Sequence, residues 1–287
     1  MGSDCGDRAL RDLQWAIESA SLITPQEYGP NWIETNDWEP WRQPLETFLK
    51  QAPSYLVGKY FESLIQFWLE HVQGVRMVAV QKQISHQRRT RGELDFVFQT
   101  IDNDLIHWET AVKFYLYDRH SSSFDSHFIG PNNRDTFERK IRRLREVQLP
   151  LGREIFPDIV SQCGFVKGRI YYHPQQFPPE TLPEHLSEQH ERAIWLRASE
   201  FGEFAANHEF CHYSLLKKPY WLAPESIETA ADALLSSNQM SELTIQHFRT
   251  STVPQHLAAF EKSTARSIET ARLFIVADTW PETAVRT

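Results

Sequence analysis

Two stretches of sequence decide the fold: RTRGELDFVF at residues 89–98 and HWETAVKFYL at residues 107–116. Both are rich in aromatic and β-branched residues, which favour strands. The sequence Asp102-Asn103-Asp104 between them is typical of a turn. We therefore expect one strand over 92–99 and another over 105–116, joined by a short link.

The flanking segments extend this pattern. Apolar residues at helical spacing predict a helix over 55–71. We expect a strand over 75–84, a helix over 134–148 and a fourth strand over 164–173. The order is helix, three strands, helix, strand. Short links between the first three strands favour an antiparallel meander, and the later helix then crosses over to the fourth strand.

The two ends of the chain are less regular. An amphipathic helix is predicted over 8–23. Beyond residue 175 the pattern weakens into an uncertain stretch at 194–206, helices near 225–235 and 241–248, and a strand at 272–276. We divide the chain into an N-terminal helical extension (1–53), a core (54–174) and a C-terminal α+β elaboration packed on the core (175–287).

Composition narrows the class of protein. The chain has 287 residues, of which 41% are hydrophobic and 24% charged, as in ordinary globular proteins. No apolar run reaches the roughly 18–20 residues of a membrane span, so no membrane partner is expected. Three widely spaced cysteines with no CxxC pair favour a reducing, cytoplasmic interior. Because the net charge is −8, any anion-binding role must come from local basic clusters.

Strand alternation gathers three ionisable side chains. Successive side chains of a strand point to opposite faces, so Glu109 and Lys113 share a face of the 105–116 strand. Asp95 can point to the same side from the neighbouring strand. Large apolar neighbours indicate that both strands are buried, and a buried acid must be paired, metal-bound or protonated.

Glu62, on the preceding helix, adds a third carboxylate. Carboxylates that converge with one lysine form the oxygen-rich set that Mg²⁺ or Mn²⁺ prefers. A metal held by Asp95, Glu109 and Glu62 can polarise a phosphodiester and activate an attacking water. Lys113 would position that water or stabilise charge on the phosphate.

This arrangement resembles the PD-(D/E)XK nuclease superfamily, the restriction-endonuclease-like fold. The resemblance implies an αβββαβ core with a mixed central sheet flanked by helices. It implies a site built from an Asp on the second strand (Asp95), an acid and a Lys on the third (Glu109 and Lys113) and a Glu on the first helix (Glu62).

More narrowly, the chain resembles a bacterial family of unknown function placed in that superfamily, domain-of-unknown-function family 1853. The resemblance covers much of residues 8–175. The matching stretches are RDLQWAIESASLI (11–23), VGKYFESLIQFWLEH (57–71), RTRGELDFVF (89–98), HWETAVKFYL (107–116) and GPNNRDTFERKIRRLREVQLPL (130–151).

One position departs from the superfamily pattern, which puts the acid two residues before the lysine, where this chain has Ala111. Glu109 precedes Lys113 by four residues, which separates their Cα atoms by roughly 13 Å on a regular strand. Both can serve one metal only if a bulge or bend shortens the path. Three interpretations stay open: a metal site with a shifted ligand, an inactive remnant, or unrelated salt bridges.

Basic residues gather in two clusters near the predicted site. Residues 134–145 contain six bases against two acids, and residues 82–91 contain a second cluster. A phosphate backbone can bind at such clusters, although a solvated helix face is the alternative interpretation. The predicted nucleic-acid contacts are Lys140, Arg143 and Arg91.

A competing motif lies at residues 208–212, where His208-Glu209-Phe210-Cys211-His212 reads H-E-x-x-H. In zinc metalloproteases this motif places two histidines one helical turn apart as Zn²⁺ ligands. No third ligand lies at a persuasive spacing. The phosphate-binding loop, dinucleotide and serine-hydrolase motifs do not occur in the sequence.

The sequence therefore predicts a nuclease that depends on Mg²⁺ or Mn²⁺, with DNA as the favoured substrate. The first alternative is a nuclease-fold scaffold without catalysis that binds nucleic acid or protein. The second is a zinc metalloprotease.

Overall fold

The computed structural model describes residues 3–24, 32, 34–35, 37–87, 89–121, 126–261 and 268–281. The chain forms two compact units, each assembled from separate segments. The first unit comprises Met1–Lys113, Arg139–Gly168 and Pro183–His190, and the second comprises Phe114–Glu138, Arg169–Leu182 and Glu191–Thr287.

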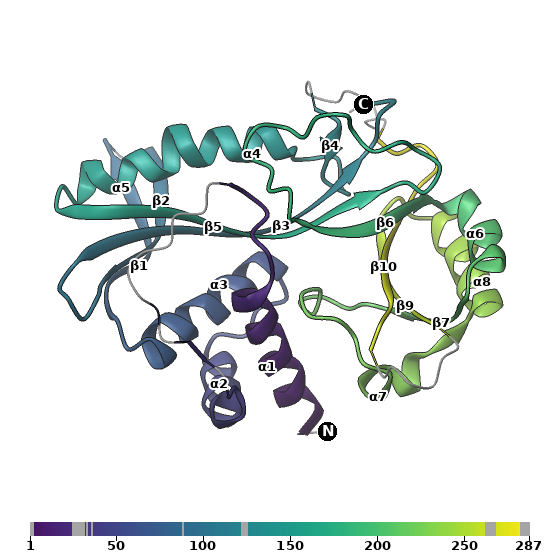
Figure 1. The fold of residues 1–287 in the computed structure, drawn as a ribbon, viewed down its shortest axis with the longest axis horizontal. Coiled ribbons are helices and arrows are strands. Elements are labelled where there is room, and N and C mark those ends of the chain that lie inside the picture. Colours follow the sequence, from purple (N-terminus) through teal and green to yellow (C-terminus); the bar gives the residue numbers. More distant parts are fainter. Residues whose placement is uncertain are drawn as a thin grey trace. The chain divides into compact units, whose positions relative to one another are not determined.

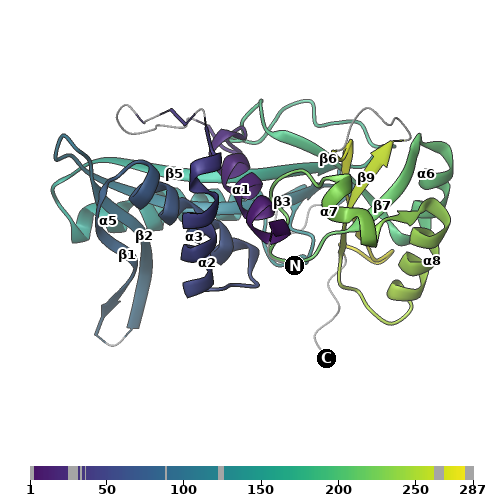
Figure 2. The ribbon, with the colours of Figure 1, turned by 90° about the horizontal axis from the view of Figure 1, so that it is seen from below.

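The first unit has helices on both sides of its strands (Figure 1). On one side lie α1 (Ser3–Glu18), the 3-10 turn η1 (Glu39–Trp41), α2 (Arg42–Gln51) and α3 (Val57–Phe67), which continues as the π-helical turn η2 (Trp68–Val72). Figure 2 looks onto the side that α1, α2 and α3 cover. The other side carries the π-helical turn η4 (Leu144–Gln148) and α5 (Leu149–Ile155), which follow α4 (Phe137–Arg143).

The strands of the first unit confirm the predicted antiparallel meander. They are β1 (Arg76–His86), β2 (Arg89–Gln99), β3 (Leu105–Tyr117) and β5 (Ile159–Tyr172), and β3 and β5 also contribute residues to the second unit. β1 pairs antiparallel with β2, and β2 pairs antiparallel with β3. β5 is the other neighbour of β3.

Apolar side chains cover both faces of these strands. On the α3 side, the Trp108 ring stacks on Phe165 with centroids 4.8 Å apart and on Trp68 at 6.1 Å. On the α5 side, Val97 and Leu151 belong to a second buried cluster. These layers cover both faces of β3, in which residues 106–110 are all buried.

Two predicted helices have different boundaries in the structure. The first helix ends at Glu18 instead of residue 23. At this end of the helix the buried Lys167 ammonium binds the carbonyls of Ile17 and Ser19. Cations at a helix C-terminus satisfy its last carbonyls. The helix expected over 134–148 begins at Phe137 and runs on to residue 155, because Pro150 falls in the first turn of α5, where proline is tolerated.

The second unit is a mixed α/β arrangement. Its elements are β4 (Phe128–Ile129), β6 (Glu191–Arg197), η5 (Ala198–Glu200), α6 (Phe201–Asn207), β7 (Phe210–Leu215), α7 (Ile227–Ala230), η6 (Ala231–Ala233), β8 (Leu235–Ser236), α8 (Ser237–Phe248), β9 (Gln255–Glu261) and β10 (Ala271–Val276). The strand order is β5-β6-β10-β9-β7-β8, parallel from β5 to β10 and antiparallel from β10 to β8. β4 pairs with the end of β3.

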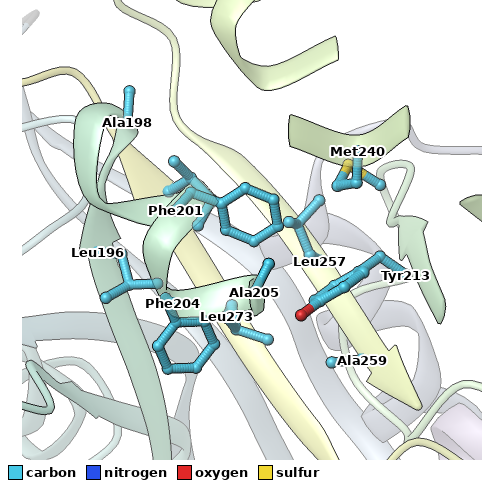
Figure 3. Close-up of a cluster of buried hydrophobic side chains, with 11 residues drawn as sticks. Leu196, Ala198, Phe201, Phe204, Ala205, Tyr213, Met240, Leu257, Ala259 and Leu273 are labelled. Atoms are coloured by element: carbon cyan, nitrogen blue, oxygen red, sulfur yellow. The ribbon is translucent and has the colours of Figure 1, made fainter. Parts of the chain in front are cut away.

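The core of the second unit lies between α6, α8 and the strands. Phe201 and Phe204 of α6 and Met240 of α8 pack on Leu257 and Leu273 of the sheet (Figure 3). The sequence predicts α8 and β10 but misses β6, β7 and β9. The helix expected over 225–235 forms only the short turns α7 and η6. None of the helices in the described part of the chain is both long and apolar enough to cross a bilayer.

The close approach of β5 to β3 depends on Gly168. This residue has φ +142°, and a Cβ placed there would lie 1.7 Å from the Lys113 carbonyl oxygen. We expect Gly168→Ala to lower the free energy of unfolding by about 3 kcal/mol or more. Gly58→Ala in α3, where a Cβ meets nothing within 4 Å, is the matched control and should change stability by no more than about 1 kcal/mol. Urea unfolding measures both, and equal stabilities for the two variants would contradict this role of Gly168.

Candidate functional site

Asp95 and Glu109 are buried side by side where β2 and β3 stop pairing. The β2–β3 ladder ends at Phe96 and Trp108, and the side chains of Asp95 and Glu109 are 8% and 1% exposed. The backbone N–H of Asp95 donates to Glu109 Oε1 at 3.4 Å. The site therefore forms at a local opening between two adjacent strands.

The Asp95 carboxylate accepts a backbone hydrogen bond from β3 that a carbonyl of a neighbouring strand would accept in a regular sheet. The backbone N–H of Thr110 donates to Asp95 Oδ2 at 2.7 Å, and the Thr110 hydroxyl lies 3.3 Å from the same oxygen. Oδ1 of Asp95 accepts no hydrogen bond from the described residues in this arrangement. One oxygen of the Asp95 carboxylate is thus held by the β3 backbone.

The electrostatics of the pair favour a cation. Burial and, after it, repulsion by the Glu109 carboxylate raise the pKa of Asp95 to about 7, against the lowering effects of the Thr110 N–H and the Lys140 ammonium. Two neighbouring carboxylates in a low-dielectric site disfavour each other's charge. A positive ion between them would relieve that repulsion.

Glu62 of α3 lies within the electrostatic range of the pair. The Glu62 carboxylate raises the pKa of Asp95. The pKa of Glu62 is itself raised, by burial and by the charges of Glu93 and Glu109, although its ion pair with Lys59 lowers it. Glu62 Oε2 accepts from Lys59 Nζ at 2.7 Å and from the Gln81 amide at 3.0 Å. The three predicted acids are therefore electrostatically coupled, with Glu62 already paired to a lysine.

Three side chains that the sequence did not predict form a network at Glu109, two in direct contact with it and the third through His107. His107 Nε2 lies 2.9 Å from Glu109 Oε1, the Gln148 amide donates to Glu109 Oε2, and the Gln162 amide donates to His107 Nδ1 at 3.1 Å. Strand alternation could have found His107, which lies two residues before Glu109 on the same face of β3. No sequence signal marks the two glutamines.

The predicted lysines take different positions. Lys113 is half-buried on β3, four residues after Glu109. Lys140 is half-buried on α4, donates to the Gln148 side-chain oxygen at 3.0 Å and lowers the pKa of Asp95. Lys140 was predicted as a phosphate contact, and the structure places it in the network around the acids.

The two predicted arginine contacts are exposed. Arg143 lies near the end of α4 with its side chain in solvent. Arg91 forms a bidentate ion pair with Glu154 of α5, in which Nη2 lies 2.8 Å from Oε2. Arg143 is thus available to a partner, whereas Arg91 is already engaged.

The H-E-x-x-H motif does not form the zinc-protease geometry. His208 ends α6 and its ring stacks on Phe204, whereas His212 lies on β7. The two histidines are therefore not one turn apart on a helix, as that chemistry requires. His212 instead contacts the neighbouring Cys211 thiol at 3.0 Å.

The donor set around Asp95 fits a hard divalent cation held partly by water. Among the described residues, no three His, Cys, Asp or Glu side chains lie close enough together to bind a metal ion as a group. Mg²⁺, however, usually keeps several waters and is bound through one or two carboxylates. Asp95 and Glu109 would supply those two, and a cation would remove the repulsion that Glu109 exerts on the Asp95 charge.

Asp95→Asn tests the electrostatics of the pair without any ligand. Because the pKa of Asp95 is about 7 in the folded chain and about 3.9 unfolded, its ionisation destabilises the fold as pH rises from about 4 to 7. Asparagine stays neutral and can still accept from Thr110. Between pH 5 and pH 8, the stability of the variant relative to wild type should therefore rise by on the order of 2–3 kcal/mol in metal-free urea unfolding. A constant difference across this range would contradict the raised pKa.

Residues 7–276 match the sequence model of the family described as Domain of unknown function (DUF1853). No curated protein and no solved structure matches this chain. The match covers both units and includes each acid of the candidate site. The chain therefore belongs to the DUF1853 family.

Proposed function

We propose that this protein hydrolyses phosphodiester bonds in nucleic acid with the help of Mg²⁺ or Mn²⁺, and that DNA is its substrate. The observation that carries the proposal is the buried pair Asp95 and Glu109, in which the Glu109 carboxylate disfavours the negative charge of Asp95. A purely structural site would gain stability from replacing one of them with a neutral residue. A cation bound between the two acids would remove that cost.

The element order of the first unit supports placing the protein in the PD-(D/E)XK superfamily. Helix α3 is followed by β1, β2 and β3, then by the helical run that ends in α5, and then by β5. Asp95 lies on the second strand and Glu109 on the third, the strands on which the superfamily resemblance expects acids, although Glu109 precedes Lys113 by four residues instead of two. The proposal therefore rests on the site's chemistry and on the topology together.

The residues take distinct roles in this proposal. Asp95 and Glu109 hold the metal, and Glu62 assists through a water. When bound, the metal supplies a Lewis acid that polarises the phosphate and activates a water. Lys113 orients the attacking water, and Lys140, whose ammonium acts on Asp95, stabilises negative charge at the phosphate.

The helical run beside the site offers a surface for a polyanion. The side chains of Arg142, Arg143 and Arg145 on α4 and η4 are exposed. In a chain with a net charge of −8, such a local concentration of arginines attracts a phosphate backbone. This surface adjoins Lys140, which reaches the acid network from the same helical run.

A nuclease-fold scaffold without catalysis is the second candidate, for two reasons. Ala111 stands where the superfamily pattern has an acid. Both oxygens of Glu109 also accept hydrogen bonds within the protein. Such a protein would bind nucleic acid without turnover. The two candidates make opposite predictions for cleavage, so one assay separates them.

Cleavage of labelled single- and double-stranded DNA and RNA tests the proposal directly. We expect cleavage with Mg²⁺ or Mn²⁺, its loss in EDTA, and a fall of at least about 100-fold in Asp95→Ala, since the metal would lose a ligand. Asp102→Ala, an exposed acid in the β2–β3 turn, is the matched control and should keep full activity. Binding without cleavage would favour the scaffold, and Zn²⁺-dependent casein cleavage lost in Glu209→Ala would favour the protease.

The arginine surface predicts a salt-dependent affinity for nucleic acid. Replacing Arg142, Arg143 and Arg145 together by Gln should weaken DNA binding and reduce the slope of log Kd against log salt by up to about 3, because each phosphate contact contributes nearly one unit. Fluorescence anisotropy with Asp95→Asn, which should bind without cutting, measures this slope. An unchanged slope would place the DNA path elsewhere.

A further inference from the structure

We propose that His107 is a positioning residue that holds Glu109 in place as a metal ligand, and that Gln162 sets the orientation and tautomer of its imidazole. This inference rests on the proposed function, because it assigns His107 a role toward the same metal. It adds residues that lie outside the acid-and-lysine pattern. His107 is 0% exposed and Glu109 1%, so solvent cannot substitute for either contact.

The hydrogen bonds around Gln162 determine which imidazole nitrogen carries the proton. The Gln162 amide nitrogen donates to the Leu149 carbonyl oxygen, which can only accept. The same nitrogen lies 3.1 Å from His107 Nδ1, so its second hydrogen points there and Nδ1 accepts. The proton of a neutral imidazole then lies on Nε2, which donates to Glu109 Oε1 at 2.9 Å.

The backbone of α5 fixes the ring in this position. A Cβ on Gly152 would lie 2.1 Å from His107 Nδ1, so the helix packs directly against the imidazole. On its other oxygen, Glu109 is held by the Gln148 amide, whose own oxygen accepts from Lys140. Glu109 is therefore held from two sides, by His107 of its own strand and by Gln148 of the helical run.

A carboxylate that hydrogen bonds hold in place is a better metal ligand, because its orientation is fixed before the metal binds. Hydrogen-bonded partners of metal ligands commonly contribute about 10–100-fold in metal affinity when mutated. Oε1 of Glu109 accepts from both His107 and the Asp95 backbone N–H, whereas Oε2 accepts the Gln148 amide and has a second lone pair for a cation. The network can thus orient Glu109 without preventing it from binding a cation.

Mn²⁺ affinity of the full chain, measured by calorimetry, tests this role. His107→Leu removes the donor and should weaken Mn²⁺ binding by about 10–100-fold. His107→Gln retains an amide donor and should recover most of that loss. His256→Phe, at another buried histidine that lies in the second unit, is the matched control and should bind Mn²⁺ as wild type does.

A second measurement reads the hydrogen bonds without metal. Nitrogen-15 NMR of the histidine side chains should show His107 protonated at Nε2 and unprotonated at Nδ1. Gln162→Leu should release this preference and weaken Mn²⁺ binding several-fold, and it serves as the test variant if His107→Leu does not fold.

The outcomes separate the inference from the proposed function. If wild type binds Mn²⁺ and both His107→Leu and Gln162→Leu bind it equally tightly, His107 has no positioning role and the proposed function stands. If wild type binds no Mn²⁺, both proposals are overturned. A proton on Nδ1 instead of Nε2 would overturn the inference alone.

Discussion

The structure of the first unit depends on one constraint: two carboxylates, Asp95 and Glu109, are buried next to each other between adjacent strands. Burying one ionised carboxylate is costly, and burying two together costs more, because their repulsion adds to the loss of water. The protein offsets this with fixed donors, namely the Thr110 backbone N–H for Asp95 and the His107 and Gln148 side chains for Glu109. These donors bind Oδ2 of Asp95 and both oxygens of Glu109, but burial and the Glu109 charge still raise the pKa of Asp95 to about 7. The remaining unfavourable energy is the reason to assign this site a cation.

The surrounding fold makes that constraint possible. The aromatic packing of Trp108 on Phe165 and Trp68 anchors β3 from the α3 side. Gly168 lets β5 approach β3 at Lys113, and Gly152 lets α5 press on His107. The site is thus supported by close backbone contacts at Gly168 and Gly152 and by an aromatic layer on the opposite face of β3. A well-packed support of this kind is what a site needs to hold charged groups in a fixed geometry.

The parts of the site that the sequence predicts are those controlled by local backbone geometry. The period of two along a strand places Asp95 and Glu109 on adjacent strands with apolar neighbours, and both prove to be buried. Gln148 and Gln162 escape prediction because their partners lie 39 and 55 residues away, and only the packing of the helical run brings them together. In the second unit, β9 escapes because a short, fully buried strand such as QHLAAFE has no alternation to distinguish it from a helix. The H-E-x-x-H match is misleading because this motif binds zinc only when both histidines lie on one helix. In this chain the five residues span the end of α6 and the start of β7.

The most direct test of this account is a crystal structure of the protein grown with saturating Mn²⁺, with data collected to give the anomalous signal of manganese. The account predicts an anomalous peak coordinated by the carboxylates of Asp95 and Glu109, with water completing the shell and Glu62 hydrogen-bonded to one of those waters. A map with no peak between Asp95 and Glu109, or with manganese bound elsewhere while this pair stays in contact, would contradict it.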